Sequence, residues 1–137
     1  MKDEIYNLIS SHNNLIDGIY IPHDLDVYVE KLVNKAIILT YHDACELKGF
    51  VAFYANNPNG EAFLSMILVH KNSQGNNIGK LLLESSIMVL RNKNILNYSL
   101  EVLKQNLKAI ELYKNFGFQI EEDKENFWRM KLILNDN

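Results

Sequence analysis

The sequence of 137 residues predicts an α/β fold, in which apolar strands and amphipathic helices alternate along the chain. Two units in the second half support this class. Strand 61–69 precedes a helical pattern over 78–93, and strand 98–103 precedes another over 107–116. A third observation is a run of three strand candidates with short, turn-rich connections, at 36–41, 47–54 and 61–69. Short connections of this kind favour an antiparallel meander.

Two helices are expected before the first of these strands. Apolar residues recur at helical spacing in the segment 2–15, at Ile5, Leu8 and Ile9, which predicts a short amphipathic helix. A second helix is expected to begin near Pro22 and to carry its apolar face up to about residue 34.

The remaining elements build the rest of the sheet and cover it. Strand 61–69 is apolar at nearly every position, as in a central strand covered on both faces, and helix 78–93 would cover one of them. Gly117 is well placed as the left-handed residue that ends helix 107–116, with Phe118 folding back near Leu112 or Tyr113. A final pair of strands, 119–122 and 127–134, completes a sheet of about six strands flanked by about four helices.

The composition bounds the class of protein. With 47% hydrophobic residues the chain can bury one substantial core but hardly two, so a single domain over 1–137 is expected. No apolar run approaches the ~18 residues that span a bilayer, and the first residues do not resemble a signal peptide, so we expect a cytoplasmic protein with no membrane partner. Cys45 is the only cysteine, and no disulfide is expected. The four histidines lack the spacing of metal ligands, so each is expected at the surface and no metal is expected.

The segment 74–80, which reads Gln74-Gly75-Asn76-Asn77-Ile78-Gly79-Lys80, predicts an anion-binding loop. Small residues let the backbone turn tightly and come close to a ligand. The first turn of the following helix offers unpaired N–H groups and the positive end of the helix dipole. We therefore expect a phosphate group here, although many such loops only connect a strand to a helix.

A second motif follows about 30 residues later, as Asn106-Leu107-Lys108-Ala109-Ile110-Glu111-Leu112-Tyr113-Lys114-Asn115-Phe116-Gly117-Phe118. Together the two segments resemble the GNAT superfamily of acyl-CoA-dependent N-acetyltransferases. The signature of that superfamily pairs a Gln/Arg-x-x-Gly-x-Gly/Ala loop with an Asn-x-x-Ala-x-x-Leu-Tyr-x-x-x-Gly-Phe helix. The resemblance covers residues 47–134 well and the first 35 residues poorly.

The resemblance implies a GNAT-type fold, with a central mixed, mostly antiparallel sheet in which strands 61–69 and 98–103 run parallel and splay apart. Backbone groups at the end of the first of these strands would bind the pantetheine arm of acetyl-CoA, the acyl donor. Asn77 occupies a slot that usually holds Gly, and Asn is the non-Gly residue best able to adopt a left-handed backbone. Asn106 is expected both to cap its helix and to bind the cofactor. The expected cofactor-binding residues are Ile67, Leu68, Val69, Gln74, Gly75, Asn76, Asn77, Ile78, Gly79, Lys80 and Asn106.

Three residues are candidates for the chemistry. An amine acceptor is mostly protonated at pH 7, since its pKa is ~8 to ~10.4, so the reaction needs a base, and the departing thiolate needs an acid. The resemblance implies Tyr113 as the acid, although this residue would also suit a packing position against Phe118. Glu101 lies where the peptide Nα-acetyltransferase branch places its base, and Glu61 lies where other relatives place a base or a substrate contact. Either carboxylate would also suit a solvent-facing strand position, or would relay a proton through a bound water.

Charge and loop length bear on the partners. A net charge of −3 argues against binding nucleic acid. Residues 68–117 hold seven Lys or Arg and three Glu, which fits binding of a polyanionic cofactor, although a solvated charge mosaic would look the same. The connection 123–126 is too short to clamp a peptide, which favours transfer of acetyl to a small primary amine, such as an amino sugar or a polyamine-like metabolite, in a ternary complex.

Two alternatives remain for the function. Peptide or protein Nα-acetylation is supported by Glu101 within Leu100-Glu101-Val102. A non-catalytic acyl-CoA-binding module, from a different class, is disfavoured because Tyr113 and Glu101 are both present. A monomer or a homodimer is expected in either case.

Overall fold

The computed structural model describes residues 1–12, 20–56, 59–75 and 77–134. Within these residues it contains one short 3-10 helix and four α-helices, which are η1 (Lys71–Ser73), α1 (Lys2–Ser10), α3 (Leu25–Lys35), α4 (Ile78–Asn92) and α5 (Leu107–Asn115). The six strands are β1 (Ile37–Asp43), β2 (Glu46–Tyr54), β3 (Glu61–Val69), β4 (Asn97–Leu103), β5 (Gln119–Lys124) and β6 (Phe127–Ile133). The predicted α/β class is confirmed.

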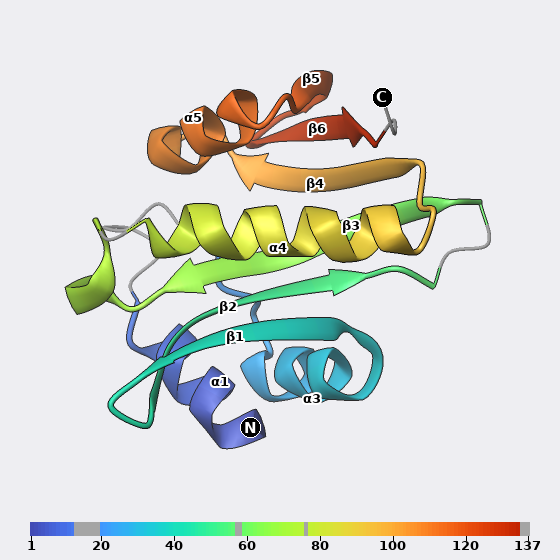
Figure 1. Ribbon diagram of the computed structural model, residues 1–137. Coiled ribbons are helices and arrows are strands. Elements are labelled where there is room, and N and C mark those ends of the chain that lie inside the picture. Colours follow the sequence, from blue (N-terminus) through green and yellow to red (C-terminus); the bar gives the residue numbers. More distant parts are fainter. Residues whose placement is uncertain (13–19, 57–58, 76, 135–137) are drawn as a thin grey trace.

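The strands form one sheet in the order β1-β2-β3-β4-β6-β5 (Figure 1). Neighbouring strands are antiparallel, except that β3 and β4 run parallel. The connection between these two strands passes through α4, which lies across the sheet in Figure 1. The sheet is therefore mixed and mostly antiparallel, as predicted, with its parallel pair at the centre.

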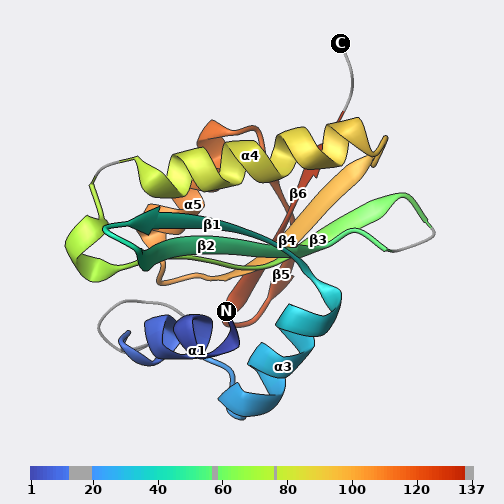
Figure 2. The same ribbon diagram turned by 60° about the horizontal axis from the view of Figure 1, so that its bottom comes forward.

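Helices cover both faces of the sheet and bury two apolar cores. On one face α4 and α5 pack around residues such as Leu83, Leu90 and Ile110. On the other face α1 and α3 bring Ile5 and Leu32 against residues of β2 and β3. Figure 2 shows α4 on one side of the sheet and α1 and α3 on the other. The sheet thus forms the middle of three layers.

A β-bulge in β3 separates the two central strands. Ser65 is an extra residue there, because its neighbours Leu64 and Met66 pair with two consecutive residues of β2. The pairing between β3 and β4 ends just before the bulge, with Leu64 opposite Leu100. Bulges bend the strand that contains them. Beyond the bulge the two parallel strands no longer pair, so the predicted splay is confirmed and its apex lies at Ser65.

Local hydrogen bonds fix both ends of α5. The side chain of Asn106 accepts a hydrogen bond from the Ala109 N–H at 3.3 Å, which confirms the predicted N-cap. Gly117 ends the helix with a φ of 102°, and the Phe118 N–H donates to the Tyr113 carbonyl at 3.0 Å, as in a Schellman motif. The ring centroids of Phe118 and Tyr113 are 5.6 Å apart, so the predicted contact is also present.

Two hairpins are tighter than predicted. β1 continues to Asp43 and β5 to Lys124, two residues beyond their expected ends. Ala44, Cys45 and Glu125 in the connecting turns have positive φ values of 52°, 64° and 62°. Such backbone angles are typical of very short hairpin turns, which let the strands pair almost to their ends.

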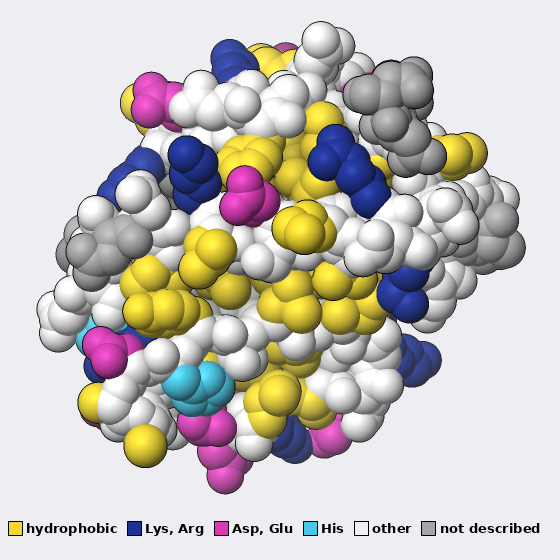
Figure 3. Space-filling model, in the orientation of Figure 1, with side chains coloured by type: hydrophobic (Ala, Val, Ile, Leu, Met, Phe, Trp, Pro, Cys, Tyr) yellow, Lys and Arg dark blue, Asp and Glu magenta, His cyan; other side chains and the backbone are white. Residues whose placement is uncertain are grey.

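The surface over α4 is chemically mixed. Leu81 and Met88 on this helix are more than half exposed, at 51% and 60%. Figure 3, which shows this side of the molecule, has hydrophobic side chains interspersed with charged ones. No helix among the described residues is both long and apolar enough to cross a membrane.

Candidate active site

One cleft of about 640 Å³ opens where β3 and β4 separate. Its walls are the end of β3, the loop that follows η1, the first turn of α4 and one side of α5. Of the predicted cofactor-binding residues, Asn76 lies outside the described part of the chain. The others all line this cleft, namely Ile67, Leu68, Val69, Gln74, Gly75, Asn77, Ile78, Gly79, Lys80 and Asn106. The structure therefore brings the two motifs together, while their role in binding stays a prediction.

The end of β3 presents backbone groups to this cleft. His70 donates its N–H to the Lys48 carbonyl at 2.7 Å, in register with the pairing of β2 and β3. Hydrogen-bonded pairs alternate in an antiparallel ladder, so Leu68 bonds to β2 whereas Ile67 and Val69 direct their N–H and C=O groups towards β4. Since β4 does not pair there, Ile67 and Val69, rather than Leu68, are the candidates to donate an N–H to a bound ligand.

The loop before α4 has the geometry of an anion site. Asn77 has φ 62° and ψ 19°, so the left-handed backbone predicted at this slot is present. Its side chain makes no capping hydrogen bond, which leaves the first-turn N–H groups of α4 without a side-chain acceptor from this residue. Gln74 ties the loop to β3, because it donates to the Val69 carbonyl at 3.3 Å. Lys80 adds positive charge at the positive end of the helix dipole.

The backbone angle at Asn77 leads to a prediction. Asn77→Gly should keep or improve acetyl-CoA affinity, because Gly adopts this conformation without a steric penalty. Asn77→Val should weaken it and should lower the free energy of unfolding by ~1–2 kcal/mol, the usual penalty for a left-handed residue with a Cβ. Calorimetric titration and urea unfolding of both variants would test this. Equal affinities for the two variants would contradict it.

The α5 wall includes residues that the motif comparison missed. Lys108, Glu111, Leu112 and Asn115 line the cleft together with Ala109. They recur three or four positions apart and so lie on one side of the helix. That spacing, counted from Asn106 at the start of the helix, is the signal in the sequence that would have identified them.

Tyr113, the candidate acid, lies in the core rather than in the lining of the cleft. It is 5% exposed and packs with residues under α4 and α5. Burial raises the pKa of its hydroxyl above the ordinary value. The hydroxyl has no hydrogen-bond partner among the described residues. The packing position is thus observed, while the acid role stays a prediction that needs the hydroxyl to reach the thioester from the inner side of α5.

The two candidate bases lie on the same face of the sheet but at different positions along the strands. Leu100 and Val102 belong to the core under α4 and α5, so Glu101 between them faces the opposite side. Glu101 is the first residue of β4 beyond its last pair with β3, which places it at the apex of the splay. Glu61 pairs with Asn97, four residues before Glu101, or about 13 Å away along the strands. Neither carboxylate lines the cleft, and Glu101 is the nearer of the two along the strands.

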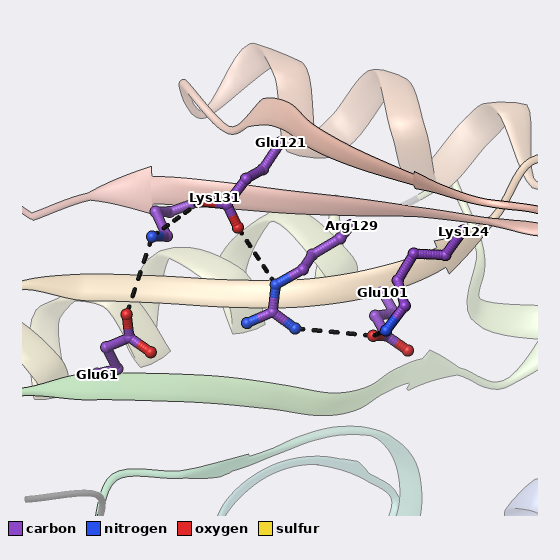
Figure 4. Close-up of polar contacts among 6 residues, drawn as sticks. All are labelled: Glu61, Glu101, Glu121, Lys124, Arg129 and Lys131. Atoms are coloured by element: carbon purple, nitrogen blue, oxygen red, sulfur yellow. Dashed lines mark hydrogen bonds and ion pairs between the residues drawn. The ribbon is translucent and has the colours of Figure 1, made fainter. Parts of the chain in front are cut away.

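Both carboxylates belong to a chain of alternating charges, which we call the charge network (Figure 4). Lys131 lies 3.8 Å from Glu61 and 2.9 Å from Glu121. Arg129 lies 3.2 Å from Glu121 and 3.7 Å from Glu101. The network ends with Lys124, 2.8 Å from the Glu101 carboxylate. Hydrogen bonds from Lys131 and Arg129 lower the pKa of Glu121, whose carboxylate is therefore charged at neutral pH.

Comparison with known proteins assigns the family. Residues 4–118 match the model of the acetyltransferase (GNAT) family. The chain belongs to this family. Its membership confirms the resemblance drawn from the two motifs, and with it the predicted enzyme class.

Individual GNAT relatives are more distant. The chain is 32% identical over 71 residues to a probable spermine N(1)-acetyltransferase of Bacillus subtilis subsp. natto (strain BEST195). That match covers 51% of this chain and 47% of the relative, so it spans about half the length of that protein. Two solved structures are similar over almost the whole chain. One is PaiA N-acetyltransferase from Thermoplasma acidophilum in complex with coenzyme A, with a TM-score of 0.80 and 20% identity over 96% of this chain and 92% of that chain. The other is ribosomal-protein-S18-alanine N-acetyltransferase from Escherichia coli, with a TM-score of 0.81 and 18% identity over 99% of this chain and 89% of that chain. At these identities the likeness shows the GNAT fold.

One residue beside the GNAT cleft corrects the sequence analysis. His12, expected at the surface, is only 5% exposed. Its Nε2 lies 3.1 Å from the Val69 carbonyl, and its Nδ1 lies 3.1 Å from the Leu8 carbonyl. His12 continues the apolar face of α1 at helical spacing from Leu8 and Ile9, which is the signal that predicted burial of that face. It connects the end of α1 to the end of β3.

Proposed function

We propose that this chain transfers the acetyl group of acetyl-CoA to the primary amine of a small molecule, by direct attack in a ternary complex. The observation that carries the proposal is the cleft of about 640 Å³ at the splay of β3 and β4. Glu101 is the first residue of β4 beyond the pairing with β3, next to this cleft but not in its lining. Membership of the GNAT family supports the acyl-transfer chemistry. The relative solved with coenzyme A supports the choice of cofactor.

In the proposed reaction, Glu101 removes a proton from the acceptor ammonium, directly or through one water. The free amine then attacks the thioester carbonyl and forms the new C–N bond. The oxyanion that develops can accept a hydrogen bond from a backbone N–H at Ile67 or Val69. When the C–S bond breaks, the sulfur leaves as a thiolate and the attacking nitrogen gives up its second proton. Tyr113 is proposed to donate a proton to the thiolate and to regain one from that nitrogen by way of water. The products are the N-acetylated amine and coenzyme A.

The proposed acceptor is an amino sugar or a polyamine-like metabolite. The hairpin between β5 and β6 supports a small acceptor, because only residues 125 and 126 separate the two strands and no long loop could clamp a peptide. The partial similarity to a probable spermine N(1)-acetyltransferase also supports an amine metabolite. Peptide Nα-acetylation is the second candidate, and it is supported by Glu101 within Leu100-Glu101-Val102, where the peptide branch of the family places its base.

The test is release of thiol from acetyl-CoA with three classes of acceptor, which are an amino sugar, spermine and a short peptide with a free N-terminus. Turnover with either of the first two and little with the peptide would support the proposal. Fastest turnover with the peptide would favour the second candidate. Binding of acetyl-CoA without thiol release from any acceptor would indicate a non-catalytic binding module.

The cofactor part of the proposal depends on Gly79. A Cβ at this position would lie 3.8 Å from Val69 Cγ2 and 4.0 Å from Leu112 Cδ2, which are ordinary contacts, so Gly79→Val should fold. Its branched side chain would nevertheless occupy the region where the backbone must approach a pyrophosphate. We expect acetyl-CoA affinity to fall at least ~10-fold, or ~1.4 kcal/mol, by calorimetry. Lys80→Ala should have a smaller effect. Unchanged affinity in a folded Gly79→Val protein would remove the basis for this cofactor site.

A further inference from the structure

Lys124 closes the charge network at its Glu101 end (Figure 4). It is the last residue of β5, next to the tight turn before β6. Its Nζ donates a hydrogen bond to Glu101 Oε2 at 2.8 Å. The side chains of Lys124 and Glu101 are 41% and 31% exposed. The hydrogen bond and charge of Glu101 raise the pKa of Lys124, so this group is an ammonium at any working pH.

The acceptor of the proposed reaction must bring the same chemical group to the same carboxylate. It arrives mainly as an ammonium, because primary amines have pKa values of ~8 to ~10.4. A base must lie within about 2.6–3.2 Å of the group whose proton it removes. The Lys124 ammonium already meets this distance at Glu101. The two ammonium groups therefore compete for one carboxylate.

We propose that the ammonium of Lys124 occupies the acceptor's ammonium position on Glu101 until the acceptor displaces it, so that Lys124 sets the affinity for the amine. This inference rests on the proposed function, in which Glu101 is the base. Displacement is easy, because an ion pair between exposed groups contributes little and lysine is a flexible point charge. Arg129 remains 3.7 Å from Glu101 and lies across from it in the pairing of β4 and β6, so the carboxylate stays oriented after Lys124 leaves.

Lys124→Met tests this directly, because methionine keeps an unbranched chain and removes the charge. In steady-state assays with the best amine of the panel, we expect the KM for the amine to fall about two- to fivefold. The kcat and the KM for acetyl-CoA should stay within about twofold of wild type, since neither depends on an empty ammonium position. Lys124→Arg keeps a competing cation and should retain the wild-type KM. Lys93→Met, at the far end of α4, is the matched control and should leave all three constants unchanged.

A double variant separates displacement from a general effect of surface charge. In a Glu101→Gln background the competition no longer exists, so adding Lys124→Met should leave the amine KM unchanged. A fall in KM that persists in that background, or an unchanged or higher KM in Lys124→Met alone, would overturn the inference. If wild-type protein releases no thiol with any amine, the proposed function itself fails and the inference falls with it. Turnover by wild type with an unaltered KM in Lys124→Met contradicts this inference only.

Discussion

Glu101→Gln is expected to lower kcat about 100-fold at pH 7, and raising the pH is expected to recover part of the loss. Glutamine keeps the shape of the side chain but cannot accept the acceptor's proton. The acceptor ammonium, with a pKa of ~8 to ~10.4, releases its own proton as the pH rises, so the need for a base declines. The measurement is the pH dependence of kcat/KM for wild type and variant. In wild type, protonation of the Glu101 carboxylate should make kcat/KM fall at acidic pH, and this part of the pH profile should be absent from the variant.

Glu61→Gln is the matched control for this prediction. Glu61 lies on the same face of the sheet and belongs to the same charge network, through Lys131 at 3.8 Å. It is about 13 Å further from the apex of the splay, so its loss should cost little activity and should show no recovery at high pH. A large, pH-dependent loss at Glu61 with little at Glu101 would assign the base to Glu61. Normal activity in both variants would indicate a water held by backbone groups.

The features that the sequence predicted well are set by a few consecutive residues. The left-handed backbone at Asn77, the N-cap at Asn106 and the end of α5 at Gly117 all depend on local φ and ψ preferences, and all three are present. The two motifs each fix one wall of the cleft. That the two walls meet in one cleft was implied by the resemblance to the GNAT superfamily.

The features that the sequence did not predict depend on pairing between distant segments. Nothing local marks Ser65 as a bulge, because the extra residue is defined only by the register of β3 against β2. The charge network likewise joins β3, β4, β5 and β6, and each of its contacts requires that the register of two strands be known. The connections were predicted to be short, but their length of only two residues was not, since Ala44, Cys45 and Glu125 are not residues that favour positive φ.

Tyr113 shows where a motif and the surrounding packing give different information. The motif assigns the residue a role at the thioester, whereas its side chain is 5% exposed and packs against Phe118. Burial raises its pKa, so the hydroxyl keeps its proton at any working pH and is a weaker acid than a tyrosine in water. A thiol has a pKa of ~8.5, so complete transfer from this hydroxyl is uphill. The expected contribution is therefore a hydrogen bond that strengthens as the C–S bond breaks, and the proton passes to the thiolate only as the hydroxyl regains one from the attacking nitrogen.

Tyr113→Phe should lower kcat about 10- to 100-fold while leaving acetyl-CoA affinity near the wild-type value. The ring contact with Phe118 is retained, and the hydroxyl has no partner among the described residues, so the free energy of unfolding should hardly change. Single-turnover kinetics would measure the chemical step, calorimetry the affinity and urea unfolding the stability. A loss confined to the chemical step is the signature of a group that acts only in the transition state.

Tyr98→Phe is the control for Tyr113→Phe, because Tyr98 is a second buried tyrosine in contact with Phe118, at 5.7 Å between ring centroids. Its hydroxyl donates to Ser86 Oγ at 3.0 Å, so its removal should lower stability by ~1 kcal/mol and leave kcat unchanged. If Tyr113→Phe lowers kcat but not stability, while Tyr98→Phe lowers stability but not kcat, the two substitutions separate a catalytic role from a packing role within one core. Wild-type turnover in Tyr113→Phe would reduce Tyr113 to a packing residue and would leave the thiolate to be protonated by water.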